Sequence, residues 1–126
     1  MNAQQPISSL MSARTWTIGL DDPVQTVEAF LADKGLTWAP VVGANGVVLG
    51  VISSADILQF HAQKGDAGKV LAWQLCTYKP ICVSPDTPIA SVAKSMVDNR
   101  IHHVVVTDRG SICGVVSSLD FVKTFI

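Results

Sequence analysis

The chain has 126 residues, of which 48% are apolar and only 15% are charged, and its formal net charge is −1. This length and composition are typical of one globular domain with a substantial apolar core, and they exclude a disordered chain. The small net charge and the lack of any run of Lys or Arg predict no nucleic-acid-binding surface and no anionic-membrane surface.

The sequence shows neither a signal-peptide pattern nor a membrane span, and its cysteine pattern favours a reducing compartment. No segment reaches the roughly 18–20 apolar residues of a membrane span, and the N-terminal residues lack the basic flank and apolar run of a signal peptide. Cys76, Cys82 and Cys113 contain no C-x-x-C pair, which predicts neither a disulfide framework nor a zinc site. We therefore expect a cytoplasmic protein with reduced thiols and no membrane segment.

The first half of the chain begins with a predicted polar leader at residues 1–10 and a predicted helix at Asp22-Pro23. Asp at the N-cap followed by Pro at the first helical position is a strong start signal, because Pro lacks an N–H that would have no partner there. Gln25 stands where it would complete a capping box. Apolar residues then follow one helical face as far as Gly35, which is expected to end the helix.

A hairpin and a second helix follow. Predicted strands at 40–42 and 47–52 flank Asn45-Gly46, a residue pair that favours tight hairpin turns. Ser53 is expected to cap the next helix, which fades before Gly65. Residues 64–75 lose this pattern and are predicted to be a connector.

The second half repeats the first. Met11-Ser12 corresponds to Cys76-Thr77 with a shift of 65 positions, and Gly50 corresponds to Gly114 with a shift of 64 because the second hairpin turn is one residue shorter. The predicted helix has the clearest apolar stripe of the chain, with apolar residues at the spacing of one helical face. The members of this stripe are Ile89, Val92, Ala93, Met96 and Val97.

One phrase occurs in both halves, as Gly50-Val51-Ile52-Ser53-Ser54-Ala55-Asp56 and as Gly114-Val115-Val116-Ser117-Ser118-Leu119-Asp120. Each copy predicts a buried strand that ends directly at a capped helix. We therefore predict an α+β fold of two tandem β-α-β-β-α units, because neither half is large enough to bury its own sheet. The two units are expected to pack sheet to sheet with pseudo-two-fold symmetry.

These residues carry a family resemblance. A doubled unit with a leading Met-Ser, an Asp-Pro helix start, a Pro-Val strand and a closing Gly-x-x-Ser-x-x-Asp resembles the CBS domain, and two in tandem resemble the CBS pair known as a Bateman module. The corresponding organisation is a leader (1–10), repeat 1 (11–63), a connector (64–75) and repeat 2 (76–126). The resemblance implies a non-enzymatic regulatory module that forms a homodimer, modulates an unidentified partner protein and requires no cofactor or metal.

The resemblance also implies the ligand and its contacts. Such modules bind adenosyl compounds (AMP, ADP, ATP or S-adenosylmethionine) in clefts between the repeats, with the aspartate on the ribose hydroxyls and the serine turn on a phosphate. The Asp120 cleft would comprise Thr17, Ile18, Leu36, Thr37, His102, His103, Ser117 and Asp120. The Asp56 cleft would comprise Cys82, Val83, Ile101, His102, Trp38, Ser53 and Asp56.

The two clefts are predicted to differ in their handling of phosphate. His102 and His103 precede a strand in the second repeat, whereas Thr37 and Trp38 stand at the matching positions of the first. A histidine supplies positive charge at neutral pH only if a nearby anion raises its pKa. We therefore expect the ligand first at Asp120, while Trp38 either stacks on a base or blocks its site.

Three alternatives stay open at this point. Each Ser-x-x-Asp could be a capping box and nothing more, with the protein a ligand-independent dimerisation or scaffold module. An enzyme built on Cys82 and His102 has no third group to complete a triad. A metal site from His102, His103 and Cys113 is disfavoured, because adjacent strand residues point to opposite faces.

Overall fold

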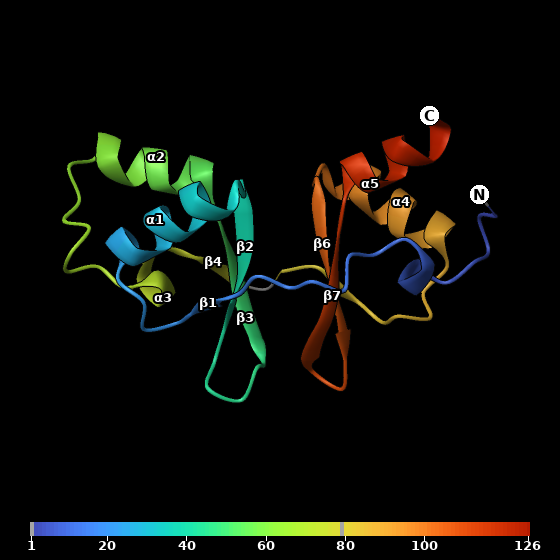
Figure 1. The fold of residues 1–126 in the computed structure, drawn as a ribbon, viewed down its shortest axis with the longest axis horizontal. Coiled ribbons are helices and arrows are strands. Elements are labelled where there is room, and N and C mark those ends of the chain that lie inside the picture. The colour runs from blue at the N-terminus through green and yellow to red at the C-terminus, as the bar shows by residue number, and fades with distance from the viewer. Residues whose placement is uncertain (1, 79) are drawn as a thin grey trace. The chain divides into compact units, whose positions relative to one another are not determined.

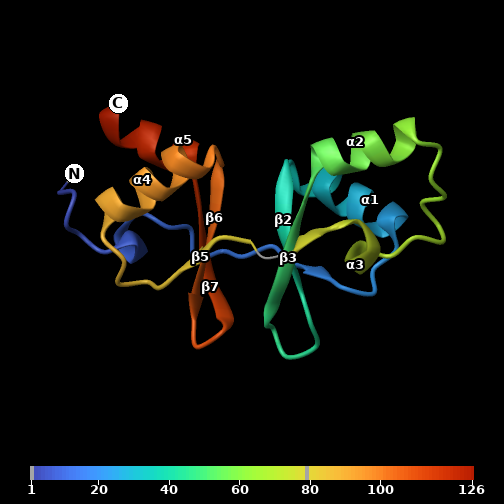
Figure 2. The same cartoon turned by 180° about the vertical axis from the view of Figure 1, so that it is seen from behind.

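The computed structural model describes residues 2–78 and 80–126 and divides into two compact units (Figure 1). The first-repeat unit comprises residues 16–78 and Pro80, and the second-repeat unit comprises residues 2–15 and 81–126. In each unit the helices cover one face of a small sheet, as Figures 1 and 2 show from opposite sides. The predicted α+β class is confirmed.

The first-repeat unit has a four-stranded sheet in the order β1-β2-β3-β4. β1 is parallel to β2, and β2 and β3 form the hairpin predicted around Asn45-Gly46, with Gly46 at a φ of 78°. Its elements are β1 (Ile18–Gly19), α1 (Val24–Lys34), β2 (Trp38–Val42), β3 (Val48–Ser53), α2 (Ser54–Ala62), α3 (Ala72–Leu75) and β4 (Thr77–Tyr78).

The second-repeat unit has a three-stranded sheet in the order β5-β6-β7, again with one parallel and one antiparallel pair. Its hairpin turn uses Arg109 and Gly110, both at positive φ, which matches the twist of the flanking strands. Its elements are η1 (Ile7–Ser9), β5 (Cys82–Val83), α4 (Ile89–Asn99), β6 (His103–Asp108), β7 (Ser111–Ser117), α5 (Ser118–Val122) and η2 (Lys123–Phe125).

The predicted start of the first helix is wrong in its details. α1 begins at Val24 with Pro23 at the N-cap, and no side chain caps it. Asp22 instead accepts a hydrogen bond from the N–H of Gly19 at 2.9 Å. The N–H groups of Val24 and Gln25 donate to backbone carbonyls of the connector, each at 2.8 Å, so a tertiary contact replaces the expected side-chain cap and capping box.

Each unit incorporates the leading segment of the other repeat. β4 pairs with β3 in the first-repeat unit, with Thr77 opposite Val51, and Ser12 bridges to Val115 of β7 in the second-repeat unit. A Cβ atom added to Gly50 would overlap the carbonyl oxygen of Thr77, and one added to Gly114 would overlap the sulfur of Met11. The glycine that opens the repeated phrase is therefore required by the close approach of this segment.

The leader and the connector turn out to be matching segments. Pro6 bridges to Pro88 as Leu71 bridges to Pro23, and both pairs are related by the shift of 65 positions. The side chains of Ile7 and Ala72, at matching positions, are both fully buried. Residues 2–10 therefore belong to the second-repeat unit, which they contact through Ile7 and backbone hydrogen bonds, although most of their side chains are exposed.

Each unit has its own apolar core between its helices and its sheet. The α4 stripe contributes Ile89, Val92 and Met96 to one core, but Val97, a predicted member of that stripe, is 76% exposed. The buried residues of the two cores include Val24, Val27, Leu31, Val41 and Ile52 in the first-repeat unit and Val104, Val106 and Val116 in the second.

Among the described residues, no helix has the length and apolar character to cross a membrane.

Candidate functional site

Both Ser-x-x-Asp turns form complete capping boxes. The N–H of Ser53 donates to Asp56 Oδ2 at 2.8 Å, and the N–H of Asp56 donates to Ser53 Oγ at 3.2 Å. In the second-repeat unit the N–H of Ser117 donates to Asp120 Oδ2 at 2.8 Å, and the N–H of Asp120 donates to Ser117 Oγ at 3.3 Å. The prediction that these turns cap helices is confirmed in both copies.

Strand pairing fixes what lies beside each turn. His103 of β6 stands opposite Ser117 of β7, and the N–H of Ser118 donates to the carbonyl of His102 at 2.9 Å. The structure thus brings together His102, His103, Ser117 and Asp120, which we name the His half-site.

The first-repeat unit repeats this geometry with other side chains. Trp38 of β2 stands opposite Ser53 of β3, and the N–H of Ser54 donates to the carbonyl of Thr37 at 2.8 Å. Thr37, Trp38, Ser53 and Asp56 therefore form a matching group, which we name the Trp half-site.

The His103 ring contributes no positive charge to the His half-site at neutral pH. Burial of the His103 ring lowers its pKa from 6.5 to about 4, with a further lowering by His102 that Asp120 partly offsets. His103 is therefore a neutral hydrogen-bonding group at neutral pH. His102, the other histidine of this half-site, is exposed.

The remaining residues predicted for the Asp120 cleft lie in the first-repeat unit. Ile18 is 2% exposed and Leu36 packs against the core, so these two side chains are occupied by packing. β1 is an edge strand, because in the described chain only β2 pairs with it. Thr17 directly precedes this edge strand and Ile18 begins it, so that both lie at the edge of the sheet.

The remaining residues predicted for the Asp56 cleft lie in the second-repeat unit and follow the same pattern. β5, formed by Cys82 and Val83, is an edge strand of its sheet, and Val83 and Ile101 pack against the second core. Partial burial raises the pKa of the Cys82 thiol, which disfavours the thiolate that a nucleophilic cysteine needs. The enzyme reading built on Cys82 and His102 gains no support from this environment.

A metal site from His102, His103 and Cys113 is not assembled. Cys113 Sγ donates to the carbonyl of Val106 at 3.5 Å, well along the hairpin from the Ser117 end, where His103 lies. Within residues 2–78 and 80–126, no group of three or more His, Cys, Asp or Glu side chains is arranged to hold an ion.

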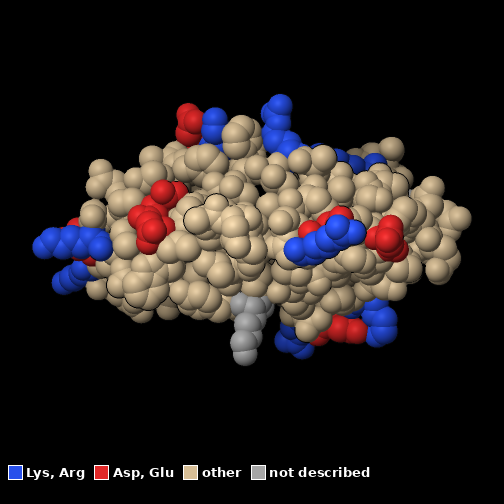
Figure 3. Space-filling model, turned by 90° about the horizontal axis from the view of Figure 1, so that it is seen from below, with Lys and Arg blue, Asp and Glu red and all other residues tan. Residues whose placement is uncertain are grey.

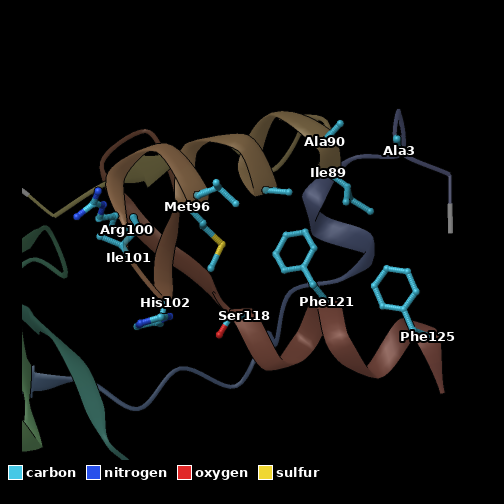
Figure 4. A pocket seen from close by; sticks show the side chains of 12 residues that line it. Ala3, Ile89, Ala90, Met96, Arg100, Ile101, His102, Ser118, Phe121 and Phe125 are labelled. Carbon is cyan, nitrogen blue, oxygen red and sulfur yellow. The ribbon is translucent and has the colours of Figure 1, made fainter.

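A concave feature that the sequence interpretation missed lies in the second-repeat unit between α4 and α5 (Figure 4). Its volume is about 640 Å³, and Arg100, His102 and Ser118 lie at one end. The signal that could have revealed it is the run of apolar residues on both helices. We name this the α4–α5 groove; its apolar lining includes Ile89, Ala93, Met96, Val97, Phe121 and Phe125.

Charged side chains are sparse on the face shown in Figure 3, where Lys and Arg are interspersed with Asp and Glu. No continuous basic area is visible on that face. The electrostatics of the described surface in this view therefore offer no extended site for a polyanion.

Comparison with known proteins adds a family and a set of structural neighbours. The CBS domain family matches residues 7–62 and 72–126. An uncharacterized protein of Methanocaldococcus jannaschii is 25% identical over 120 residues, which cover 94% of this chain and 42% of that protein. A homoserine O-acetyltransferase of Methanococcoides burtonii is 27% identical over 115 residues, which cover 90% of this chain and 23% of that enzyme. The chain spans less than half the length of these curated relatives.

Solved structures share the fold over almost the whole chain. A CBS domain pair in complex with 5-methylthioadenosine and S-adenosyl-L-methionine superposes with a TM-score of 0.86 at 24% identity, covering 97% of this chain and 100% of that chain. A CBS domain protein from Pyrobaculum aerophilum, complexed with AMP, superposes with a TM-score of 0.83 at 26% identity. The superposition covers 91% of this chain and 88% of that chain. The predicted resemblance is confirmed at the level of fold and domain pair.

Proposed function

Because the chain belongs to the CBS domain family, with two such domains in tandem, we propose that it is a regulatory module that binds an adenosyl ligand and modulates a partner protein. The candidates are AMP, ADP, ATP and S-adenosylmethionine. The proposal includes the homodimer, the cytoplasmic location and the absence of catalytic activity that the family resemblance implies.

The observation that carries this proposal is the recurrence of one polar turn at the same place in both units. Each turn sets a serine and an aspartate at a strand-to-helix junction. The relative that is complexed with AMP is 26% identical and supports an adenine nucleotide as the first candidate. We assign the Asp120 carboxylate to the ribose hydroxyls and Ser117 to the phosphate or its equivalent.

The hydrogen-bond acceptor capacity that remains on the Asp120 carboxylate fits this assignment. In the described part of the chain Asp120 accepts through Oδ2 from the N–H of Ser117, which leaves Oδ1 available to a ribose hydroxyl. A carboxylate that accepts bonds from two neighbouring hydroxyls gives a charge-assisted and geometrically specific contact. The capping box and the ligand contact are therefore compatible in one side chain.

Regulation would follow from a shift in population. A ligand stabilises only the arrangement that it binds more tightly, and the free energy available for regulation is the difference between its affinities for the two arrangements. The partner protein would then respond to the arrangement that the ligand favours.

Thermal unfolding with AMP, ADP, ATP, S-adenosylmethionine and NAD, each added separately, tests the proposal. A ligand at 100 times its Kd adds about 2.7 kcal/mol to the free energy of unfolding, so the correct compound raises the melting temperature clearly. Asp120→Ala should abolish that rise, with Asp56→Ala as the matched control. If no adenosyl compound changes the melting temperature of the wild-type protein, the sensor proposal fails.

A ligand-independent scaffold is the second candidate. It is favoured by the completeness of both capping boxes, in which each serine and each aspartate has a hydrogen-bond partner. In that case Asp120→Ala and Asp56→Ala lower the stability of the free protein by similar amounts, about 1 kcal/mol for the loss of a cap, and no ligand restores it.

A further inference from the structure

The α4–α5 groove has a polar end and an apolar end. In Figure 4, Arg100 and His102 lie at one end, whereas Phe125 and Ala3 lie at the other. The volume of about 640 Å³ falls within the roughly 300–1,000 Å³ of small-molecule pockets, which are mostly apolar with a few polar groups. This arrangement suits a small molecule that has a polar head and an apolar tail.

The charge at the polar end selects the kind of head group. Of the described residues that line the groove, Arg100 is the one with a permanent charge. Asp98, two residues earlier, pairs with Lys94, with 2.6 Å between Oδ2 and Nζ, and in the described part of the chain the Arg100 guanidinium takes part in no ion pair. A guanidinium matches a carboxylate with two parallel hydrogen bonds. One fixed cation also balances a monoanion better than a phosphate, which carries close to two negative charges.

The backbone at Arg100 is unfavourable for any residue other than glycine. Arg100 is the C-cap of α4 and has a φ of 53° and a ψ of 44°, in the left-handed region. Gly35 occupies the matching position at the end of α1 with a φ of 65°, as is usual for this kind of helix end. The second repeat therefore carries an arginine at the mouth of the groove at a conformational cost, and such costs are concentrated at functional sites.

The first-repeat unit has a different lining at the matching place. Glu28 and His61 occupy the positions that match Ala93 and Phe125, and His61 Nε2 lies 2.6 Å from Glu28 Oε2. A polar pair there connects α1 to α2, where the second-repeat unit has a small apolar residue and an exposed aromatic ring. The fold thus requires neither the apolar lining nor the arginine, and the second repeat combines both.

We propose that the α4–α5 groove binds a free medium-chain fatty acid, with its carboxylate on Arg100 and its hydrocarbon chain directed toward Phe125. The tail is assigned as a hydrocarbon because the side chains that line the middle of the groove have no hydrogen-bond donor. An adenosyl compound would leave its ring nitrogens and hydroxyls without side-chain partners there. The proposal therefore concerns a second site, and it does not rest on nucleotide binding at the serine-aspartate turns.

Isothermal titration calorimetry of the whole chain with decanoate, kept below its micellar concentration, tests the proposal. Wild-type protein should bind decanoate saturably and should bind decanol, which has the same chain and no charge, at least about tenfold more weakly. Arg100→Gln should lose at least about tenfold in affinity for decanoate and should no longer distinguish the two compounds. His102 stays unchanged in every variant, because it also belongs to the His half-site.

Arg100→Gly separates a binding role from a structural one. Glycine relieves the left-handed backbone, so this variant should melt at a higher temperature than the wild type while it loses decanoate binding. An arginine that served only the fold would lower the melting temperature when it is replaced.

A matched pair of charge substitutions tests the position of the tail. Val97→Glu places a carboxylate in the groove and should weaken decanoate binding at least about tenfold, whereas Ala32→Glu places it at the matching position of α1 and should leave binding unchanged. Both positions are exposed, so neither substitution disturbs a core. Absence of saturable decanoate binding to the wild type, or equal affinity for decanoate and decanol, overturns the proposal. Both of these measurements use wild-type protein and are independent of the thermal shifts with adenosyl compounds.

Discussion

His103 and Trp38 occupy the same position in the two units, yet they give their half-sites different chemistry. Both stand opposite the capping serine of the adjacent strand. His103 is held neutral by burial, and it can exchange hydrogen bonds with a ligand or accept a proton from one. Trp38 offers a large aromatic surface and a single N–H donor. At the residue scale, the His half-site is the one suited to a polar ligand group.

The lowered pKa of His103 predicts a pH dependence of stability. The folded value of about 4 lies below the ordinary 6.5, so the neutral ring stabilises the fold fully above pH 6.5. As pH falls from 6.5 toward 4, the unfolded chain takes up a proton that the folded chain refuses, and stability decreases by up to about 1.4 kcal/mol per pH unit.

Urea unfolding of wild type and of His103→Gln across that pH window measures this effect. The variant should show a flatter dependence of the free energy of unfolding on pH, while His102→Gln, which removes the neighbour that lowers the pKa of His103 further, should flatten it less. Parallel curves for wild type and His103→Gln would show that His103 titrates normally in the folded protein.

At the element scale, the structure explains the glycine that begins each repeated phrase. The segment that leads repeat 2 pairs beside Gly50, and the segment that leads repeat 1 pairs beside Gly114, so that neither glycine has room for a side chain. At Gly50 the obstacle is the backbone carbonyl of Thr77, whereas at Gly114 the nearest atom belongs to the flexible side chain of Met11. The two glycines therefore tolerate substitution differently.

Gly50→Ala should lower the free energy of unfolding by about 1–3 kcal/mol, because strand β4 must shift, and Gly114→Ala should cost less. Met11→Ala should recover part of the loss in Gly114→Ala by removing the colliding sulfur. Gly43→Ala is the control, since its added Cβ comes no nearer than 3.7 Å to any atom and should be tolerated. Chemical denaturation measures all four variants, and equal stability of Gly50→Ala and Gly43→Ala would refute the close approach.

Elements with strong local signals were predictable from the sequence, and those that depend on distant partners were not. The hairpin at Asn45-Gly46 and the serine caps follow from neighbouring residues alone, and both are confirmed. The cap of α1 was predicted wrongly, because its N–H groups are satisfied by the connector and not by Asp22. The match between leader and connector was missed because the shared feature is backbone pairing, which leaves little trace in side-chain identity.

At the scale of the whole molecule, one duplicated fold carries two unequal halves. The repeat period predicted two tandem units, the motifs within them gave the resemblance to CBS domains, and the family match confirms that resemblance. The burial that neutralises His103 and the groove between α4 and α5 could not be predicted, because both depend on how elements distant in the sequence pack in three dimensions. The two units differ in side-chain chemistry at matching positions, as Trp38 and His103 show.

The central claim is that an adenosyl ligand binds first through Asp120, and isothermal titration calorimetry with AMP tests it most directly. Wild type and Asp56→Ala should bind AMP, while Asp120→Ala, shown to be folded by circular dichroism, should lose at least about tenfold in affinity, or about 1.4 kcal/mol. Wild-type affinity in folded Asp120→Ala would contradict the assignment of the site. Absence of heat with AMP and with each of the other three adenosyl compounds would contradict the function itself.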